Sequence, residues 1–175
     1  FDENYFKFLK KDKKNIVRNK INFQKIQFKN VSFRYPGNKK KIISNLNLNL
    51  KFNDKIGIVG DTGSGKSTLI NILVGLLSHT NGDILIDGIK IDNLKKDWQN
   101  SLSYVPQNIL TIDENFVDNI TLGEKKIDKP FLKRIIKILN LDEVQKRFSK
   151  LNTIGEHGSR ISGGQNQRIG LARAF

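Results

Sequence analysis

The sequence predicts a mixed α/β domain, and three observations support this prediction. Residues 26–52 contain two stretches in which apolar and polar side chains nearly alternate, as they do in half-buried strands. A glycine-rich segment at 60–68 stands between a short apolar run and a longer one. Residues 113–150 then carry helical patterns. Early antiparallel strands, strand–helix alternation and a helical insert together indicate an α/β architecture.

The first two strands follow from alternation. In the first, the pattern slips once, which predicts a β-bulge. Its apolar members are Ile26, Phe28, Val31, Phe33 and Tyr35. The residues Tyr-Pro-Gly-Asn at 35–38 then predict a turn. Residues 45–52 alternate strictly, so their apolar side chains should face inward; these are Leu46, Leu48, Leu50 and Phe52.

The later elements are shorter. Apolar runs predict three further strands, at 55–60, 83–87 and 102–105. Residues 67–77 are apolar on nearly all sides and predict a buried helix. Asp128 and Pro130 predict the start of another helix.

Composition excludes several classes of protein. No run of about 18 apolar residues is present, so the sequence contains no membrane-spanning helix. The 175 residues include no cysteine, which excludes disulfides and fits a reducing compartment. They also include no methionine, even at position 1. We therefore expect the sequence to be a piece of a longer protein.

The positive charge is unevenly distributed. The net charge is +14, and residues 1–41 hold 13 Lys and Arg against three acidic residues. Either this segment only improves solubility, or it is attracted to an anionic surface. That surface would be nucleic acid or the cytoplasmic face of a membrane.

The segment GDTGSGKST is the most informative part of the sequence. It fits the phosphate-loop pattern G-x-x-x-x-G-K-[ST], between a predicted strand and a predicted helix. Glycines let the backbone approach a polyphosphate, and a helix N-terminus offers unpaired N–H groups. A plain glycine-rich turn before a core helix is the structural alternative. The expected nucleotide-binding residues are Gly60, Asp61, Thr62, Gly63, Ser64, Gly65, Lys66, Ser67 and Thr68.

Three further motifs narrow the family. They are an aromatic residue, Tyr35; YVPQN at 104–108, which contains Gln107; and ISGGQ at 161–165. Their order around the phosphate loop resembles that of the ATP-binding domain of ABC (ATP-binding cassette) proteins. The resemblance implies a P-loop NTPase of ABC ATPase type, with an antiparallel β-subdomain, a RecA-like core and a helical subdomain. The expected boundaries are a linker at 1–20, a nucleotide-binding core at 21–109, a helical subdomain at 110–160, and the signature with its helix at 161–175.

The resemblance also implies roles for residues. Tyr35 would stack on adenine, which typically contributes about 1–3 kcal/mol. Lys66 would reach the terminal phosphates of ATP, and Ser67 with Gln107 would bind Mg²⁺. Ser162, with the residues that follow it, would bind the γ-phosphate of an ATP held by a second, head-to-tail domain, expected to be a second copy. The signature residues are Ser162, Gly163, Gly164 and Gln165, and the catalytic residues would be Lys66, Gln107 and Ser162.

The exporter branch of the family is the most similar. TIGEHG at 153–158 resembles a segment of exporter-type members that contacts the membrane domain, and residues 1–20 resemble a basic linker from such a domain. Residues 98–109 look most like flippases of lipid-linked oligosaccharides or polysaccharides. These features imply ATP-driven transport at the cytoplasmic face of a membrane, with no nucleic acid partner.

Two other functions stay open at this point. One is a soluble ABC ATPase acting on nucleic acid or ribosomes, although the 53 residues between Gln107 and Ile161 leave no room for the long arms of such proteins. The other is a non-catalytic nucleotide-binding module. The sequence stops at Phe175, before the Walker B strand and its Asp-Glu pair, so we expect this piece to be truncated ahead of the hydrolytic residues.

Overall fold

The computed structural model describes residues 21–124, 126–149, 153–155 and 160–175. The chain forms two compact units, which divide after Leu102. Each unit has its own hydrophobic core. Among the described residues, no helix combines the length and the apolar character that crossing a membrane requires. The domain boundaries expected from the sequence stay predictions.

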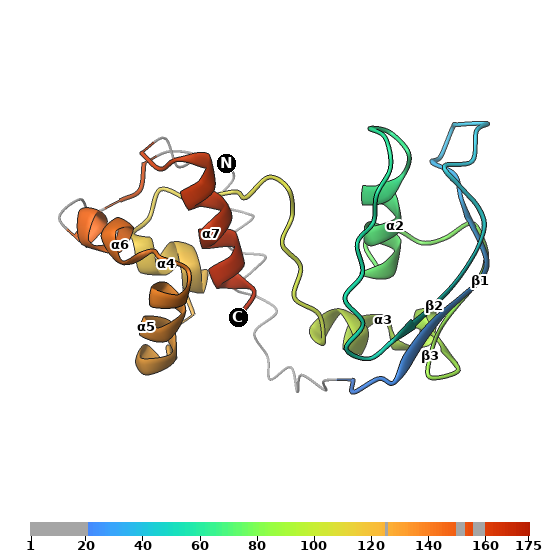
Figure 1. The fold of residues 1–175 in the computed structure, drawn as a ribbon, viewed down its shortest axis with the longest axis horizontal. Helices are drawn as coiled ribbons and strands as arrows, with labels where there is room; N and C mark the ends of the chain where they lie inside the picture. The colour runs from blue at the N-terminus through green and yellow to red at the C-terminus, as the bar shows by residue number, and fades with distance from the viewer. Residues whose placement is uncertain (1–20, 125, 150–152, 156–159) are drawn as a thin grey trace. The chain divides into compact units, whose positions relative to one another are not determined.

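The first unit contains a four-stranded antiparallel sheet (Figure 1). Its spatial order is β2-β1-β3-β4. The strands are β1 (Lys25–Phe33), β2 (Ile43–Lys51), β3 (Asn81–Ile86) and β4 (Ile89–Lys90). The predicted bulge is confirmed, because the pairing of β1 with β2 changes register between Phe28 and Val31. The antiparallel subdomain expected from the alternating pattern is therefore present.

The predicted turn after β1 is also confirmed. The N–H of Asn38 donates to the carbonyl of Tyr35 at 3.1 Å, and Gly37 has a φ of 80°. A turn with proline at its second position and a positive φ at its third is of type II, which favours glycine there. This turn fixes where Tyr35 lies, at the end of β1.

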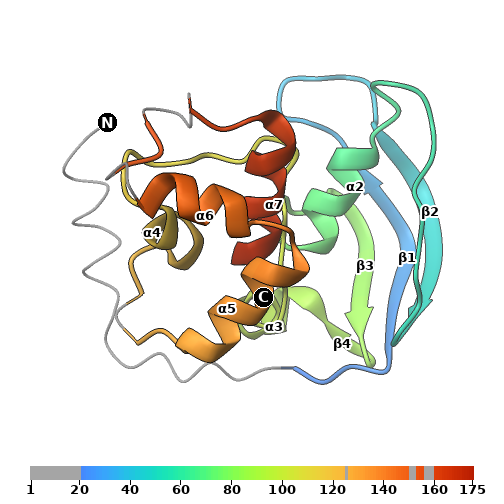
Figure 2. The ribbon, with the colours of Figure 1, turned by 60° about the vertical axis from the view of Figure 1, so that its left-hand side comes forward.

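Two helices, α2 (Lys66–Leu73) and α3 (Ile91–Asn100), cover one face of the sheet (Figure 2). They bury a common core with the strands. Its residues are Ile26, Phe28, Val31, Phe33, Leu50, Ile72, Ile84, Ile86, Ile91 and Trp98. The helix predicted over 67–77 is shorter than expected, because Gly75 adopts a φ of 74° and the chain turns. The indole N–H of Trp98 donates to the carbonyl of Leu73 at 2.7 Å and so satisfies the end of α2.

Two strand predictions are wrong. Residues 55–60 and 102–105 are not strands, although both are apolar. A strand needs a neighbour for its backbone hydrogen bonds, and no strand among the described residues pairs with either segment. Ile56 and Val59 are accordingly 52% and 92% exposed. The local composition favours strands in these two segments, but a strand forms only where another strand pairs with it.

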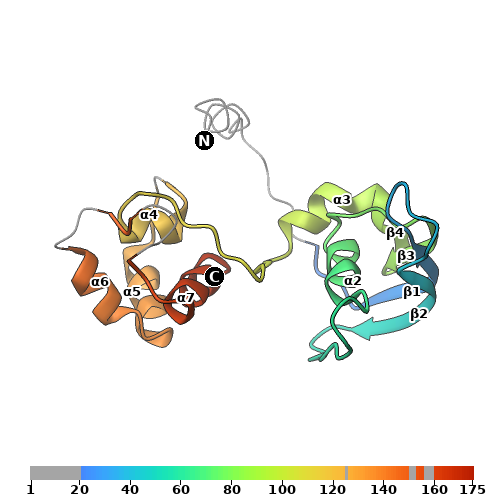
Figure 3. The same cartoon turned by 90° about the horizontal axis from the view of Figure 1, so that it is seen from above.

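The second unit is helical (Figure 3). Its helices are α4 (Phe116–Thr121), α5 (Lys129–Ile138), α6 (Asp142–Ser149) and α7 (Gly163–Arg173). The predicted start of α5 is confirmed, since the Asp128 carboxylate accepts the N–H of Phe131 at 2.9 Å. The core contains Phe116, Ile120, Ile135, Ile136, Leu141, Val144, Phe148, Ile154, Ile169 and Ala172.

Two aromatic residues predicted to be buried are exposed. Phe52 was expected to face inward with the leucines of β2, but it follows the last residue of that strand and is 54% exposed. The spacing of Ile169, Ala172 and Phe175 along the signature helix also predicts one stripe that packs on the core. Ile169 and Ala172 are buried, whereas Phe175 lies beyond the end of α7 and is 67% exposed. Periodicity holds only while the element continues.

Several sequence predictions concern residues outside the described ones. The linker at 1–20 is one of them. The segment TIGEHG is described only at 153–155, where the N–H of Ile154 donates to the carbonyl of Glu114 at 3.1 Å and Ile154 is fully buried. Its His157 lies outside the described residues.

Candidate functional site

The glycine-rich loop leads directly into α2, as the motif predicted. Gly65, the residue before the helix, has a φ of 95°. A Cβ at this position would lie 2.8 Å from Cγ2 of Ile42, so both the backbone and the packing require glycine. Gly63 also has a positive φ, 82°, but a Cβ there would meet no atom within 4 Å. Gly60 at the start of the loop is constrained as well, since its φ is 151° and a Cβ there would lie 2.8 Å from the Ser64 hydroxyl oxygen.

Lys66 closes the loop on itself. Its ammonium donates to the carbonyls of Gly60 and Asp61, both at 2.7 Å. An ammonium carries three N–H donors, so these two bonds leave one for a further acceptor. Among the described residues, no acceptor meets the N–H groups of Lys66, Ser67 or Thr68, and the helix has no side-chain cap. The start of α2 therefore presents N–H donors and the positive end of the helix dipole.

The two hydroxyl residues at the start of α2 face different surroundings. Ser67 is exposed, while Thr68 is buried with 7% of its surface accessible. The Thr68 hydroxyl lies 3.1 Å from the Tyr35 hydroxyl, within hydrogen-bonding distance. The fold thus brings Tyr35 and the phosphate loop together, although they are far apart in the sequence.

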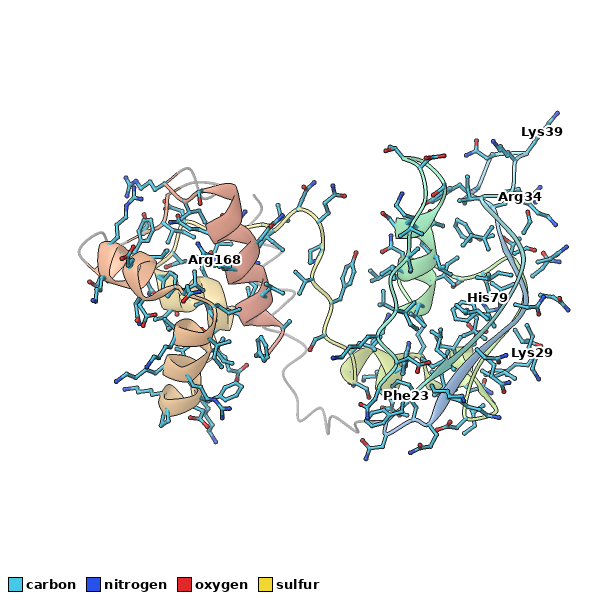
Figure 4. The ribbon with its side chains drawn as sticks, in the orientation of Figure 1. Phe23, Lys29, Arg34, Lys39, His79 and Arg168 are labelled. Carbon is cyan, nitrogen blue, oxygen red and sulfur yellow. The ribbon has the colours of Figure 1, made fainter. Side chains whose placement is uncertain are left out.

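The Tyr35 ring borders an open hollow. The ring packs edge-on against Phe33, with centroids 4.9 Å apart, and it is 36% exposed. The hollow has a volume of about 480 Å³ and is lined by Arg34, Tyr35, Pro36, Gly37, Asn38, Lys39 and Thr80. Figure 4 shows Arg34 and Lys39 at the end of the sheet where this turn lies, with Phe23 at the opposite end. An aromatic face beside cationic side chains suits a base next to phosphates.

Gln107 lies in the second unit, in a segment without regular structure. Its side chain is exposed, whereas Ile109 two residues later is buried. The two units are separate bodies, so Gln107 and the signature belong to one and the phosphate loop with Tyr35 to the other.

The signature residues form a capped helix N-terminus. The N–H of Gln165 donates to the Ser162 hydroxyl at 3.2 Å, and the N–H of Ser162 donates to the Gln165 side chain at 3.0 Å. This capping box satisfies one donor of the first turn of α7. In the described part of the chain, the N–H groups of Gly163 and Gly164 have no acceptor, and a Cβ at either position would meet nothing within 4 Å. Among the residues of this unit that the structure describes, none requires glycine at these two positions.

Helix α7 is attached to the segment that follows Gln107. The Asn166 amide donates to the carbonyl of Ile109 at 2.9 Å. One turn later, Gly170 approaches the same residue so closely that a Cβ on it would lie 2.3 Å from Cδ1 of Ile109. Arg173 donates to the carbonyl of Leu110 at 2.6 Å, and burial lowers the pKa of its guanidinium from the usual value. The signature helix and this segment are therefore packed as one piece.

A buried asparagine that was not predicted from the sequence binds the segment after Gln107 through several hydrogen bonds. Asn119 on α4 is fully buried, and its amide nitrogen donates to the carbonyls of Ile112, Glu114 and Asn115. Its amide oxygen accepts the N–H of Ile112 at 2.9 Å. The available signal was the position of Asn119, three residues after Phe116 and next to Ile120, because helical spacing puts it beside these apolar residues and buried amides are normally bonded.

The described residues show one ion pair and no metal-like cluster. Lys90 and Asp83 pair across β3 and β4 at 2.7 Å, and the hydrogen bond from Lys90 lowers the pKa of the Asp83 carboxyl. No group of three or more His, Asp or Glu side chains gathers within the described ranges.

The antiparallel sheet, the glycine loop entering α2 and the separate helical unit define a nucleotide-binding domain of the phosphate-loop class. The comparison with known families is specific: the profile described as ABC transporter matches residues 43–175. The chain belongs to the ABC transporter family, and this membership implies that the nucleotide is ATP.

Several relatives of this chain carry the names of exporters or flippases. It is 40% identical over 154 residues to a candidate export ATP-binding/permease protein of Rickettsia typhi, covering 86% of this chain and 27% of that protein. It is 34% identical to the ATP-dependent lipid A-core flippase of Wigglesworthia glossinidia brevipalpis, covering 86% and 26%. A bacterial Atm1-family ABC exporter solved with ATP bound is similar with a TM-score of 0.78 and 25% identity, over 98% of this chain and 32% of that one. The chain thus spans about a quarter of the length of these curated relatives.

Proposed function

We propose that this chain is the ATP-binding and ATP-hydrolysing domain of a membrane exporter. It would power the export or flipping of a substrate by ATP-driven dimerisation of two such domains. The observation that carries this proposal is the start of α2, where three N–H groups and the Lys66 ammonium surround one glycine loop. The exporter and flippase names of the relatives support the coupling to transport.

Each predicted residue has a role in this proposal. The loop would hold the phosphates of ATP while Tyr35 stacks on its base. On binding, the remaining N–H of the Lys66 ammonium would donate to a phosphate oxygen, a charged and therefore stronger acceptor than a carbonyl. Ser67 and Gln107 suit Mg²⁺ because this ion prefers oxygen ligands and keeps several waters. When bound, Mg²⁺ would neutralise charge on the β- and γ-phosphates.

The signature helix would act on a partner domain. Gly163 and Gly164 have open space and free N–H donors in the described part of the chain, which supports a contact with something outside this unit. The Ser162 hydroxyl accepts from Gln165 and can still donate its own hydrogen. These groups would bind the γ-phosphate of ATP held by a second, head-to-tail copy. Two copies would then enclose two ATP molecules.

The membrane part of the proposal concerns the whole protein. We place a transmembrane domain on the same chain and this domain at the cytoplasmic face. The names of the relatives, which join ATP-binding and permease functions, support this arrangement. Six apolar spans encoded upstream of Phe1 would agree with the proposal, whereas a start codon directly before Phe1 would contradict it.

Lys66→Ala tests nucleotide binding. We expect the substitution to abolish ATP binding in the full-length protein, because it removes the only side-chain cation that contacts the loop among the described residues. Equilibrium binding of a fluorescent ATP analogue provides the measurement. Lys96→Ala, an exposed lysine on α3, is the matched control and should bind ATP normally. Unchanged ATP affinity in Lys66→Ala would overturn the assignment of the phosphate loop.

Ser162→Arg tests the partner contact. The larger cationic side chain should leave ATP binding to one domain intact but block the approach of the second domain. Distances between spin labels on the two domains, with and without ATP, measure this approach. Ser149→Arg, at an exposed position on α6, is the control. Normal ATP-dependent closure in Ser162→Arg would count against the role of the signature.

A further inference from the structure

The Tyr35 hydroxyl is the least expected feature of the nucleotide-binding residues. A ring that only stacks on a base needs no hydroxyl, since phenylalanine offers the same face. Here the hydroxyl lies 3.1 Å from Oγ1 of Thr68, the third residue of α2. The bond joins the end of β1 to the helix that begins at the phosphate loop, across 33 residues of sequence.

Thr68 is placed differently from the rest of the loop. Of the two hydroxyl residues at the start of α2, Ser67 is exposed, whereas Thr68 has only 7% of its surface accessible. The Thr68 side chain thus faces Tyr35 rather than open solvent. The sequence alone had suggested a direct contact between Thr68 and a phosphate.

Two contacts determine where the Tyr35 ring lies. Phe33 packs edge-on against it at 4.9 Å, which limits its position but leaves its tilt adjustable. The hydroxyl bond to Thr68 fixes the far end of the ring. Because the ring is 36% exposed beside the hollow, a loss of this bond would let it turn toward solvent.

We infer that Thr68 is a positioning residue, which holds Tyr35 in the orientation that stacks on the nucleotide base. This inference rests on the proposed function, because it assumes that ATP binds between Tyr35 and the phosphate loop. Thr68 acts through Tyr35 and contributes to recognition of the base rather than of the phosphates. Through this bond, the start of α2 sets the distance between the base-stacking surface and the phosphate loop.

The inference separates two ligands. AMP-PNP, a slowly hydrolysed ATP analogue, carries both base and phosphates, whereas inorganic tripolyphosphate carries phosphates alone. Isothermal titration calorimetry with Mg²⁺ on the full-length protein measures both affinities. We expect Thr68→Val to weaken AMP-PNP binding about 3- to 10-fold, the usual range for one hydrogen bond. Tripolyphosphate affinity should change by less than about twofold.

Further variants make the test specific. Tyr35→Phe removes the other hydroxyl of the bond and should weaken AMP-PNP binding to the same extent. The double variant should be no weaker than either single one, because both substitutions break one interaction. Thr68→Ser keeps the hydroxyl and should bind as the unmodified protein does, which also covers the case in which Thr68→Val fails to fold. Thr121→Val removes a hydroxyl that bonds only the helix backbone in the other unit, and it serves as the control.

The outcomes distinguish the inference from the proposed function. Equal weakening of AMP-PNP and tripolyphosphate by Thr68→Val would overturn the inference, because Thr68 would then act on the phosphates. Additive losses in the double variant would overturn it as well. If Tyr35→Ala and Lys66→Ala both left AMP-PNP affinity unchanged, the proposed nucleotide site itself would be wrong.

Discussion

Gly170 offers the sharpest test of how the signature helix is held. It lies in the interior of α7, where glycine is unfavourable by about 1 kcal/mol relative to alanine. Gly170→Ala would therefore stabilise an isolated helix. In this structure the new Cβ would lie 2.3 Å from Cδ1, 2.7 Å from Cγ1 and 3.3 Å from Cγ2 of Ile109. The close approach of this segment to α7 explains the glycine.

The expected magnitude follows from these contacts. Rotation of the Ile109 side chain about Cβ–Cγ1 moves only Cδ1, and rotation about Cα–Cβ, which moves all three carbons, is opposed because this side chain is buried. A backbone shift at Ile109 is resisted, because its carbonyl accepts from Asn166 at 2.9 Å. Overpacking of this kind costs about 1–3 kcal/mol, against a gain of about 1 kcal/mol in helix propensity. Because three carbons of Ile109 are approached closely, we expect the cost to lie in the upper part of its range and Gly170→Ala to destabilise the second unit by up to about 2 kcal/mol.

Hydrogen–deuterium exchange of the α7 amides in the full-length protein measures this change. A loss of about 1.4 kcal/mol corresponds to tenfold faster exchange. Gly164→Ala is the matched control, because a Cβ there meets nothing within 4 Å and should slow exchange instead. Ile109→Val removes the nearest carbon and should partly restore Gly170→Ala. Equal protection in Gly170→Ala and Gly164→Ala would refute the reasoning.

Three further predictions concern other parts of the chain. Asn119→Ala should destabilise the second unit by about 1–3 kcal/mol in the same exchange experiment, because it removes a fully buried side chain and leaves the N–H of Ile112 without its acceptor; protection within about 0.5 kcal/mol of the unmodified protein would contradict this. Gly65→Ala should reduce ATP affinity more than Gly63→Ala in a direct binding titration. Both positions have a positive φ, but only at Gly65 would the new Cβ also approach another atom, at 2.8 Å. Equal losses of affinity would argue against a role for this contact. The pKa of the Asp83 carboxyl in the folded protein lies below its value of 3.8 in the unfolded chain. Its bond to Lys90 therefore stabilises the protein above about pH 4, and this stabilisation is lost as the pH falls through the lowered pKa. In an NMR titration, Lys90→Gln should raise the pKa of Asp83.

The local sequence predicted what local forces decide. The bulge in β1, the turn at Pro36 and Gly37 and the Asp128 cap were all predicted and are all confirmed. The turn and the cap depend on backbone preferences and on hydrogen bonds between residues three apart, so no distant residue is needed to form them. The bulge involves pairing with β2, but the slip in the alternation that marks it lies within β1 itself.

The errors came where a distant partner decides. Residues 55–60 and 102–105 have the composition of strands, but no described strand pairs with them. Phe52 and Phe175 continue apolar patterns beyond the elements that gave those patterns meaning. In each case the apolar pattern was identified correctly, but the pattern does not say whether another part of the chain packs against those residues.

The sequence by itself determined the phosphate loop, the signature and the family to which the chain belongs, because these motifs encode chemistry in adjacent residues. Only the tertiary structure decided that the Thr68 hydroxyl meets Tyr35, that Gly170 admits Ile109, and that Asn119 holds the segment after Gln107. These contacts join residues from different elements, or a side chain to a loop, and each depends on how folding packs those parts together. The spacing of residues along the chain does not show which of them will pack together.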